Sequence, residues 1–156
     1  MTRNHNEFVV EIGGRFALFT RPEAKIERVS FEVPPASTVQ GMLEAIYWHP
    51  GVRYAILAIR PLRPVRWQSM TVKGLKGKGT ADEPFRMRQQ MLADVLYQIR
   101  ARIHVSDDSQ TPADKAWQIF CRRASQGQSY RPIYLGTREC LADTLRLVTP
   151  AVRAHA

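Results

Sequence analysis

The sequence is poor in the residues that build metal centres, disulfide frameworks and membrane spans. Its 156 residues include only 2 cysteines and 4 histidines, and the histidines are scattered along the chain. Two cysteines form neither a disulfide framework nor a zinc site by themselves. No apolar run approaches the roughly 18 residues of a spanning helix, and the first seven residues lack the apolar segment of a secretory signal. We therefore expect a cytoplasmic protein with reduced cysteines, no bound metal and no cofactor.

Acidic residues are also scarce. Lys and Arg number 23 against 14 Asp and Glu, which gives a net charge of +9. Residues 45–81 and 115–138 contain no acidic residue at all, yet they carry seven and five of the Lys and Arg. Such a surplus indicates a polyanionic partner, either nucleic acid or an anionic membrane surface. The two segments form one basic face if the fold brings them together, and otherwise they are two unrelated solvated faces.

The length and the 44% apolar share predict one globular domain. Within it, two segments have the periodicity of amphipathic helices. Ser37 and Gln40 have the spacing of a capping box, and Pro50 ends the pattern. The second helix is expected to begin near Pro112 and to stop at Gly127. The apolar stripes of the two helices are Val39, Met42, Leu43 and Ile46, and Trp117, Phe120, Cys121 and Ala124.

Four segments read as strands. Residues 8–12 close on Gly13, residues 54–59 form a continuous apolar run typical of a buried strand, and residues 65–69 alternate. Residues 95–105 alternate over a longer span and predict a strand with a basic outer face, while residues 73–79 read as a flexible cationic loop. The order of strands and helices predicts an α+β fold: a ferredoxin-like (RRM-like) βαββαβ domain with an extra strand or hairpin.

Several blocks, in order along the chain, resemble one protein family. They are residues 17–23, 27–31, 41–50, 94–99 and 134–140, and they are similar to the CRISPR-associated Cas-five family, type I-C (Dvulg) subtype, of the RAMP superfamily. The resemblance implies a ferredoxin-like RNA-binding domain over residues 1–140. Family members continue into a second, strand-rich region, so residues 141–156 are expected to be a short C-terminal remnant of it.

The resemblance also implies an activity and its residues. The type I-C members that this chain resembles are metal-independent endoribonucleases, which cut precursor CRISPR RNA in the repeat and stay on the 5′ handle of the product. Their catalytic positions fall on Tyr47 and Lys115, whereas their histidine position holds Ala116. Metal-free cleavage uses the RNA's own 2′-OH, so the site must move protons and stabilise charge on the phosphorane. His104, on the basic face of the long strand, is a weak candidate to replace the missing histidine.

The basic segments supply candidate RNA contacts. Three lysines of the 73–79 loop suit phosphate groups, and Trp67 suits base stacking, although a place in the core fits it nearly as well. The full set of expected RNA-binding residues is Arg21, Lys25, Arg28, Arg66, Trp67, Lys73, Lys76, Lys78, Arg100, Arg102, Arg123, Arg131 and Arg138.

Three functions stay open at this point. The first is a metal-independent endoribonuclease, which Tyr47 and Lys115 favour. The second is a non-catalytic subunit that holds the 5′ handle, which Ala116 and the short C-terminal segment favour. The third is a nonspecific binder of duplex DNA or RNA. The expected partners are CRISPR repeat RNA or the crRNA 5′ handle, other subunits of a type I-C interference complex or, for the third function, duplex DNA; no membrane partner is expected.

Overall fold

One long strand, β5 (Pro84–Val105), is the centre of the sheet. The computed structural model describes residues 6–23, 27–75, 84–109 and 111–148. The second half of β5 pairs with β1 (Glu7–Ala17) on one side and β3 (Val52–Pro61) on the other, both antiparallel. Its first half pairs with β4 (Trp67–Leu75) and, in parallel, with β2 (Arg28–Val29).

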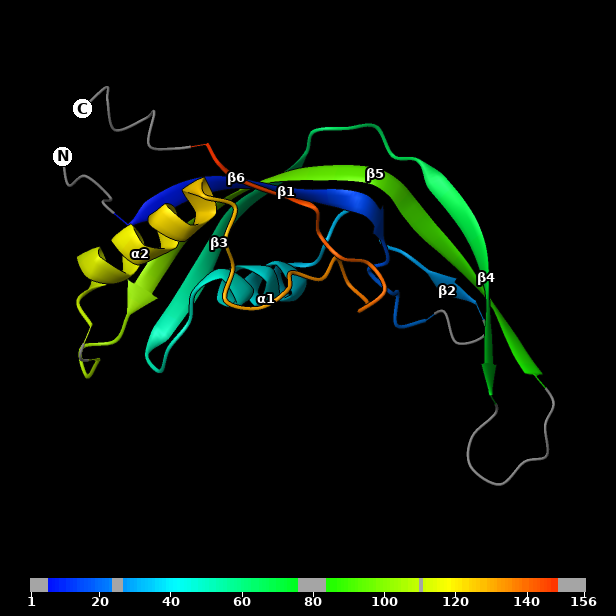
Figure 1. The fold of residues 1–156 in the computed structure, drawn as a ribbon, viewed down its shortest axis with the longest axis horizontal. Helices are drawn as coiled ribbons and strands as arrows, with labels where there is room; N and C mark the ends of the chain where they lie inside the picture. The colour runs from blue at the N-terminus through cyan, green and yellow to red at the C-terminus, as the bar shows by residue number, and fades with distance from the viewer. Residues whose placement is uncertain (1–5, 24–26, 76–83, 110, 149–156) are drawn as a thin grey trace.

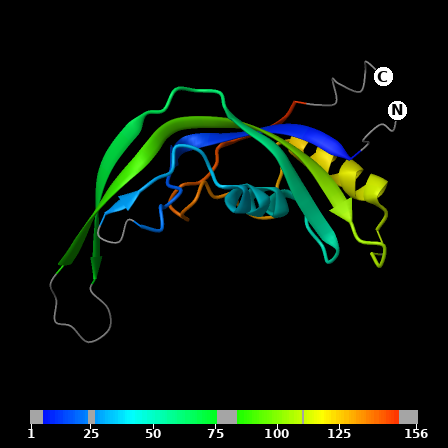
Figure 2. The same cartoon turned by 180° about the vertical axis from the view of Figure 1, so that it is seen from behind.

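The two helices and the last strand complete a ferredoxin-like fold. Helix α1 (Ala36–Ile46) follows β1 and β2, helix α2 (Ala113–Ser125) follows β5, and β6 (Thr144–Leu147) pairs with β1. The resulting strand order β3-β5-β1-β6 is that of a βαββαβ unit in which both helices cross over the sheet. Both helices lie on the same, concave side of the sheet (Figure 1), and the view from behind in Figure 2 likewise shows no helix on the upper, convex side. The predicted fold class is confirmed.

The core lies between the helices and one face of the sheet. The alternation predicted for residues 95–105 is confirmed, because Tyr97, Ile99, Ala101 and Ile103 are all buried. The ring centroids of Phe8 on β1 and Phe120 on α2 lie 4.1 Å apart. Sheet and second helix therefore pack directly, while the other side chains of the same strands point to the open face.

The extra strand is β4, which forms a long hairpin with β5. The hairpin projects beyond the rest of the sheet (Figure 1). The expected loop at residues 73–79 is therefore wrong in part, since β4 continues to Leu75 and includes Lys73. A ladder of backbone pairs with β5, such as Lys73 with Arg86, keeps this segment extended despite its glycine. Lys76 and Lys78 lie outside the described residues.

The ends of α1 and β1 differ from the sequence-based boundaries. Helix α1 begins at Ala36 with Pro35 as its N-cap, so the capping box at Ser37 is wrong, and the amide of Gln40 donates to the carbonyl of Tyr54 instead. Strand β1 continues through Gly13 to Ala17. A Cβ at Gly13 would lie 2.4 Å from the carbonyl oxygen of Val95, so this glycine permits close strand pairing rather than a turn.

Strand β3 is an edge strand, and the expectation of a buried strand is wrong. It pairs only with β5 among the described strands, and a register shift lies between Ile56 and Ala58. Leu57 is 43% exposed, although Tyr54 at the start of the run is buried. An apolar run by itself does not reveal whether a second strand covers its outer edge.

Strand β6 lies in the segment that was expected to be a C-terminal remnant. It pairs with β1 from Val10 to Gly13, and Leu145 and Leu147 pack against the core. The sheet therefore extends past residue 140. Within the described ranges, neither helix has the length and apolarity needed to cross a bilayer.

Candidate nucleic-acid interface

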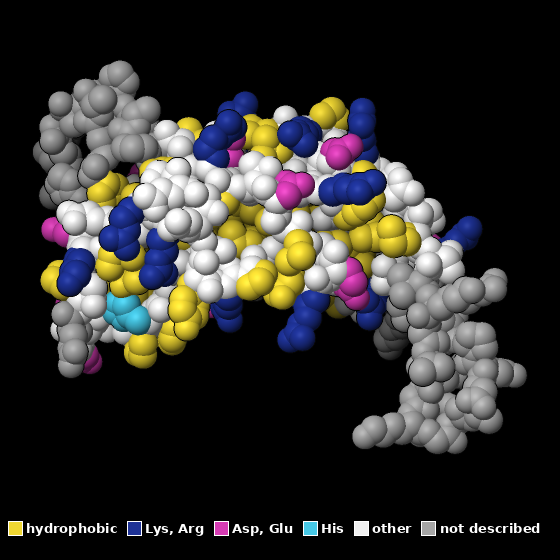
Figure 3. Space-filling view, viewed as in Figure 1, with side chains coloured by type: hydrophobic (Ala, Val, Ile, Leu, Met, Phe, Trp, Pro, Cys, Tyr) yellow, Lys and Arg dark blue, Asp and Glu magenta, His cyan; other side chains and the backbone are white. Residues whose placement is uncertain are grey.

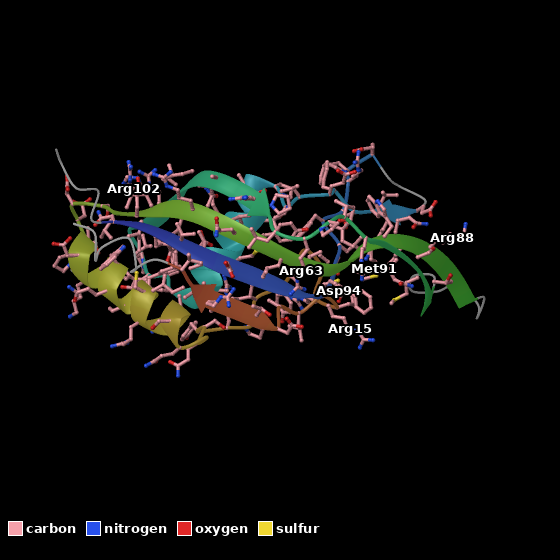
Figure 4. All side chains as sticks on the ribbon, turned by 90° about the horizontal axis from the view of Figure 1, so that it is seen from above. Arg15, Arg63, Arg88, Met91, Asp94 and Arg102 are labelled. Carbon is pink, nitrogen blue, oxygen red and sulfur yellow. The ribbon has the colours of Figure 1, made fainter. Side chains whose placement is uncertain are left out.

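The open face of the sheet carries a row of arginines. Across the β3–β5 pair, Arg53 stands opposite His104, Ala55 opposite Arg102 and Ala58 opposite Arg100. Residues that are directly opposite share a face, so these basic side chains lie together. In Figure 3, Lys and Arg side chains line the upper rim of the molecule, over the sheet, with acidic side chains between them. Figure 4, seen from above, shows Arg102 near one end of β5 and Arg88 near the other.

Two glutamates on β1 neutralise part of this charge. The carboxylate oxygens of Glu7 lie 3.0 Å from Arg100 Nη2 and 2.7 Å from Arg102 Nη2. The hydrogen bond from Arg102 holds the pKa of Glu7 below its usual range. In the same way Glu11 pairs with Arg146 of β6. Arg100 and Arg102 are therefore on the predicted face, but they are tied to an acidic partner.

A groove of about 460 Å³ lies along the edge of β3. Arg53 and His104 line it from the sheet, and Gln40 and Glu44 line it from α1. His104 is exposed, as expected for a side chain on the outer register of β5. The groove therefore combines two basic groups and one acidic group at the border between the open face and the helix layer.

Tyr47 lies where α1 ends. It is the C-cap residue, with an extended backbone and its N–H bonded to the carbonyl of Leu43. Its side chain is 7% exposed, and burial raises the pKa of its phenol although the charge of Arg123 opposes the shift. The phenol of Tyr54 donates to the Tyr47 carbonyl. Tyr47 is therefore fixed in place and protonated at neutral pH.

Arg123 is the cation that contacts Tyr47. Its guanidinium carbon lies 5.3 Å from the centroid of the Tyr47 ring, and its Nη1 donates to the Ile46 carbonyl at 2.8 Å. That carbonyl is at the C-terminal end of α1, where the helix dipole favours a positive charge. One side chain from the last turn of α2 thus holds the end of α1 and the tyrosine after it.

Lys115 and Ala116 lie at the other end of α2. Lys115 is exposed in the first turn, and the rise of about 1.5 Å per residue places it about 12 Å from Arg123 along the helix axis. Ala116 is fully buried. The structure therefore brings Arg123 rather than Lys115 against Tyr47, and position 116 faces the core.

Arg21 and Arg28 lie near β2, beside acidic groups. Arg21 Nη1 lies 3.6 Å from a carboxylate oxygen of Glu23, and the guanidinium of Arg21 stacks 5.1 Å from the Phe31 ring centroid. Arg28 contributes, after hydrogen bonds from Thr137 and the backbone, to lowering the pKa of Glu139. Arg138 is exposed. Lys25 lies outside the described residues.

Arg66 and Trp67 stand at the base of the β4–β5 hairpin. Trp67 is 45% exposed, so it is a surface residue and not a core residue. Arg66 Nη1 lies 3.6 Å from a carboxylate oxygen of Asp94, and both side chains are mostly exposed. Lys73 lies further along β4, where the side chains are outside the described part. These residues lie on the β4–β5 hairpin, whereas Tyr47 lies at the end of α1, so they belong to a separate surface.

One family model matches nearly the whole chain. The family model of the CRISPR-associated Cas5 proteins, in its Cas5d form, matches residues 8–156. The chain belongs to the Cas5 family. It is 37% identical to the "CRISPR pre-crRNA endoribonuclease Cas5d" of Thermus thermophilus over 137 residues, and 35% identical over 158 residues to the protein of that name from Mannheimia succiniciproducens. These alignments cover 83% and 86% of this chain, which spans 59% and 69% of the relatives' own lengths.

Solved structures show the same fold. A structure described as a CRISPR-associated protein superposes with a TM-score of 0.72 at 24% identity, covering 95% of this chain and 69% of that one. A chain of a "CRISPR RNA-guided surveillance complex" superposes with a TM-score of 0.56 at 16% identity, covering 94% and 66%. At this level of identity both comparisons support the fold alone.

The sequence-based site of this Cas5 chain divides into separate parts in three dimensions. Arg100, Arg102 and His104 share the open face, whereas Tyr47 and Arg123 lie together at the end of α1. Arg53 joins the first group and was missed, because the run that follows it read as buried on both faces. The signal was present, since Arg53 alternates with the buried Val52 and Tyr54. The contact of Arg123 with Tyr47 had no sequence signal, because 76 positions separate them.

Proposed function

We propose that this chain binds precursor CRISPR RNA and cleaves it within the repeat without a metal ion, in the cytoplasm. The names of two curated relatives support the substrate and the reaction. The observation that carries the proposal is the position of Tyr47, whose protonated phenol is fixed under the charge of Arg123. The row of arginines on the open face supplies the positive surface that an RNA backbone requires.

The proposed reaction has two proton transfers. The 2′-OH of the RNA loses its proton and attacks the adjacent phosphate, and the departing 5′-oxygen gains a proton. Because its pKa is raised, Tyr47 stays protonated and is a weak acid, so its phenol suits a hydrogen bond to the phosphate and not a proton transfer in either direction. The departing 5′-oxygen takes its proton from water. Arg123 stabilises the charge that grows on the phosphorane. Lys115, in the first turn of α2, suits a neighbouring phosphate of the bound RNA. His104 is the candidate base, and its groove adjoins the end of α1 through Glu44.

A second function is favoured by one specific observation. Ala116 is buried where the family resemblance places a histidine, and Lys115 lies about 12 Å from Arg123 along the axis of α2. A chain with this arrangement suits a subunit that holds the 5′ handle within a type I-C interference complex without cutting. Such a subunit would keep the basic surface that binds RNA and lose only the ability to cleave it.

The deciding experiment is cleavage of end-labelled repeat RNA in EDTA. We expect one cut, with a rate lowered about 10²- to 10⁴-fold in the Tyr47→Phe, Lys115→Ala double variant. Tyr134→Phe, which changes an exposed tyrosine on another loop, is the matched control and should cut normally. Tight binding of intact repeat RNA with no cut would favour the handle-holding subunit. Equal binding of random duplex DNA would contradict both and favour nonspecific binding.

A further inference from the structure

A second groove lies at the C-terminal end of α1, and the reaction proposed above does not use it. Trp48, Tyr130, Arg131 and Glu44 line this groove, whose volume is about 280 Å³. That volume is just below the range of about 300–1,000 Å³ that is usual for ligand pockets. The groove therefore suits a single flat ring, and two of its four lining residues are aromatic.

Both aromatic walls are exposed, and both are anchored to the end of α1. Trp48 is 51% exposed and Tyr130 is 82% exposed. The indole Nε1 of Trp48 donates to the carbonyl of Val52 at 3.1 Å, which fixes the ring on the turn after α1. The backbone N–H of Arg131 donates to the Ala45 carbonyl at 3.1 Å. The segment after α2 passes alongside α1 in Figure 1, and this bond ties it there. The Trp48 ring and the backbone next to Tyr130 are thus held at the end of α1, and both rings stay at the surface.

The charges around the groove favour a nucleic acid. Arg131 is exposed at its rim, and Glu44 lines both this groove and the neighbouring groove of Arg53 and His104. The two grooves therefore adjoin on either side of Glu44. A polyanion that follows Arg53 to Arg131 passes this carboxylate, which repels phosphate groups but accepts hydrogen bonds from the amino groups of bases.

We propose that Trp48 and Tyr130 stack on one unpaired nucleobase of the bound RNA, with Arg131 at the adjoining phosphate. Every base has a flat face, so this contact adds affinity without requiring one sequence. Trp48 directly follows Tyr47, the C-cap residue of α1, so a base stacked on Trp48 holds the RNA at the end of α1, where Tyr47 lies. The inference rests on the proposed RNA function, because it names a subsite of the same interface.

The test is the affinity of repeat RNA for single variants of the full chain. Loss of one stacking contact raises Kd by roughly 5- to 150-fold. We expect Trp48→Ala and Tyr130→Ala each to raise the Kd for repeat RNA by a factor in that range. Tyr130→Phe keeps the ring and should bind as the unaltered chain does. Leu141→Ala, which removes a side chain that is 55% exposed on another surface, is the matched control and should also bind normally. Because Tyr130 is so exposed, its replacement leaves folding intact even if Trp48→Ala does not.

RNA with single abasic positions identifies the stacked base. One abasic substitution should weaken binding to the unaltered chain, have a smaller effect on Tyr130→Ala, which keeps the stack on Trp48, and have no further effect when both rings are replaced by alanine. This non-additivity is the signature of a direct contact. Unchanged affinity in both alanine variants would overturn the stacking site and leave the RNA function intact. Failure of the unaltered chain to bind repeat RNA would overturn the RNA function, and the stacking site with it.

Discussion

Arg123 joins the two helices through one side chain. It donates a hydrogen bond to the Ile46 carbonyl and lies against the Tyr47 ring. Composition and periodicity place it among the basic residues of an acid-free segment, with nothing to distinguish it from Arg122 next to it. The structure separates the two, because Arg123 is half-buried against α1 while Arg122 is exposed.

We expect Arg123→Ala to lower the free energy of unfolding by about 2 kcal/mol, the scale of a hydrogen bond to a charged group together with a cation–π contact. Arg122→Ala removes the same charge from the same helix turn, so the helix-dipole contribution is matched. That control should change stability by less than about 0.5 kcal/mol. Urea denaturation of the three proteins measures both values. Equal effects would show that charge at the helix end, and not the contact with α1, stabilises the chain.

At the scale of the element, β5 changes partners in its middle. Residues 84–92 pair with β4, and residues 97–105 pair with β3. Asp94 lies at the change and has a φ of 51°, in the left-handed region. Figure 4 shows it between the two halves of the strand. Aspartate tolerates this conformation better than most residues do, because its short polar side chain bonds locally.

Asp94→Val should therefore destabilise the fold by about 1–2 kcal/mol, the strain of a left-handed residue with a Cβ branch. Asp94→Asn is the matched control and should stay within about 0.5 kcal/mol, since asparagine also adopts this conformation. Both variants remove the carboxylate that faces Arg66, so the effect of losing this exposed ion pair on stability is the same in both. Thermal or urea unfolding measures the difference. A loss of equal size in both variants would assign the effect to the ion pair.

The elements themselves were largely predictable. The stripe of α1 from Val39 to Ile46 is buried as the spacing predicts, and so is the alternating face of β5. The prediction failed where a neighbour decides the outcome. Strand β1 continues past Gly13 because Val95 approaches its backbone, and β3 is exposed because no described strand covers its outer edge. Sequence periodicity reports one face of an element and not what lies beside it.

At the scale of the whole molecule, three buried tyrosines link stability to pH. Burial raises the pKa values of Tyr47, Tyr54 and Tyr97. In the unfolded chain these phenols lose their protons near pH 10, whereas in the folded chain they keep them. The unfolded state thus binds fewer protons above that pH. The stabilisation is complete below about pH 10 and is lost as the pH rises through the raised pKa values.

We expect the free energy of unfolding, and with it the urea midpoint, to fall steadily between pH 10 and pH 11.5. Each such tyrosine contributes up to about 1.4 kcal/mol per pH unit to the fall in free energy. Tyr54→Phe removes the phenol that donates to the Tyr47 carbonyl, so it lowers stability at pH 8 but should make the alkaline fall shallower. Tyr130→Phe removes an exposed phenol and is the matched control. An alkaline slope that is the same in Tyr54→Phe as in the unaltered chain would contradict the linkage.

The sequence by itself determined the fold class, the segregation of charge and the family. These are carried by local periodicity, by composition and by blocks of residues in order, none of which depends on how distant segments meet. Only the tertiary structure decided that Tyr47 lies against Arg123 and away from the first turn of α2, and that Trp48 and Tyr130 share a groove. The physical reason is that contacts between residues far apart in sequence follow from strand order, register and helix packing, which fix each side chain's neighbours only after the chain has folded.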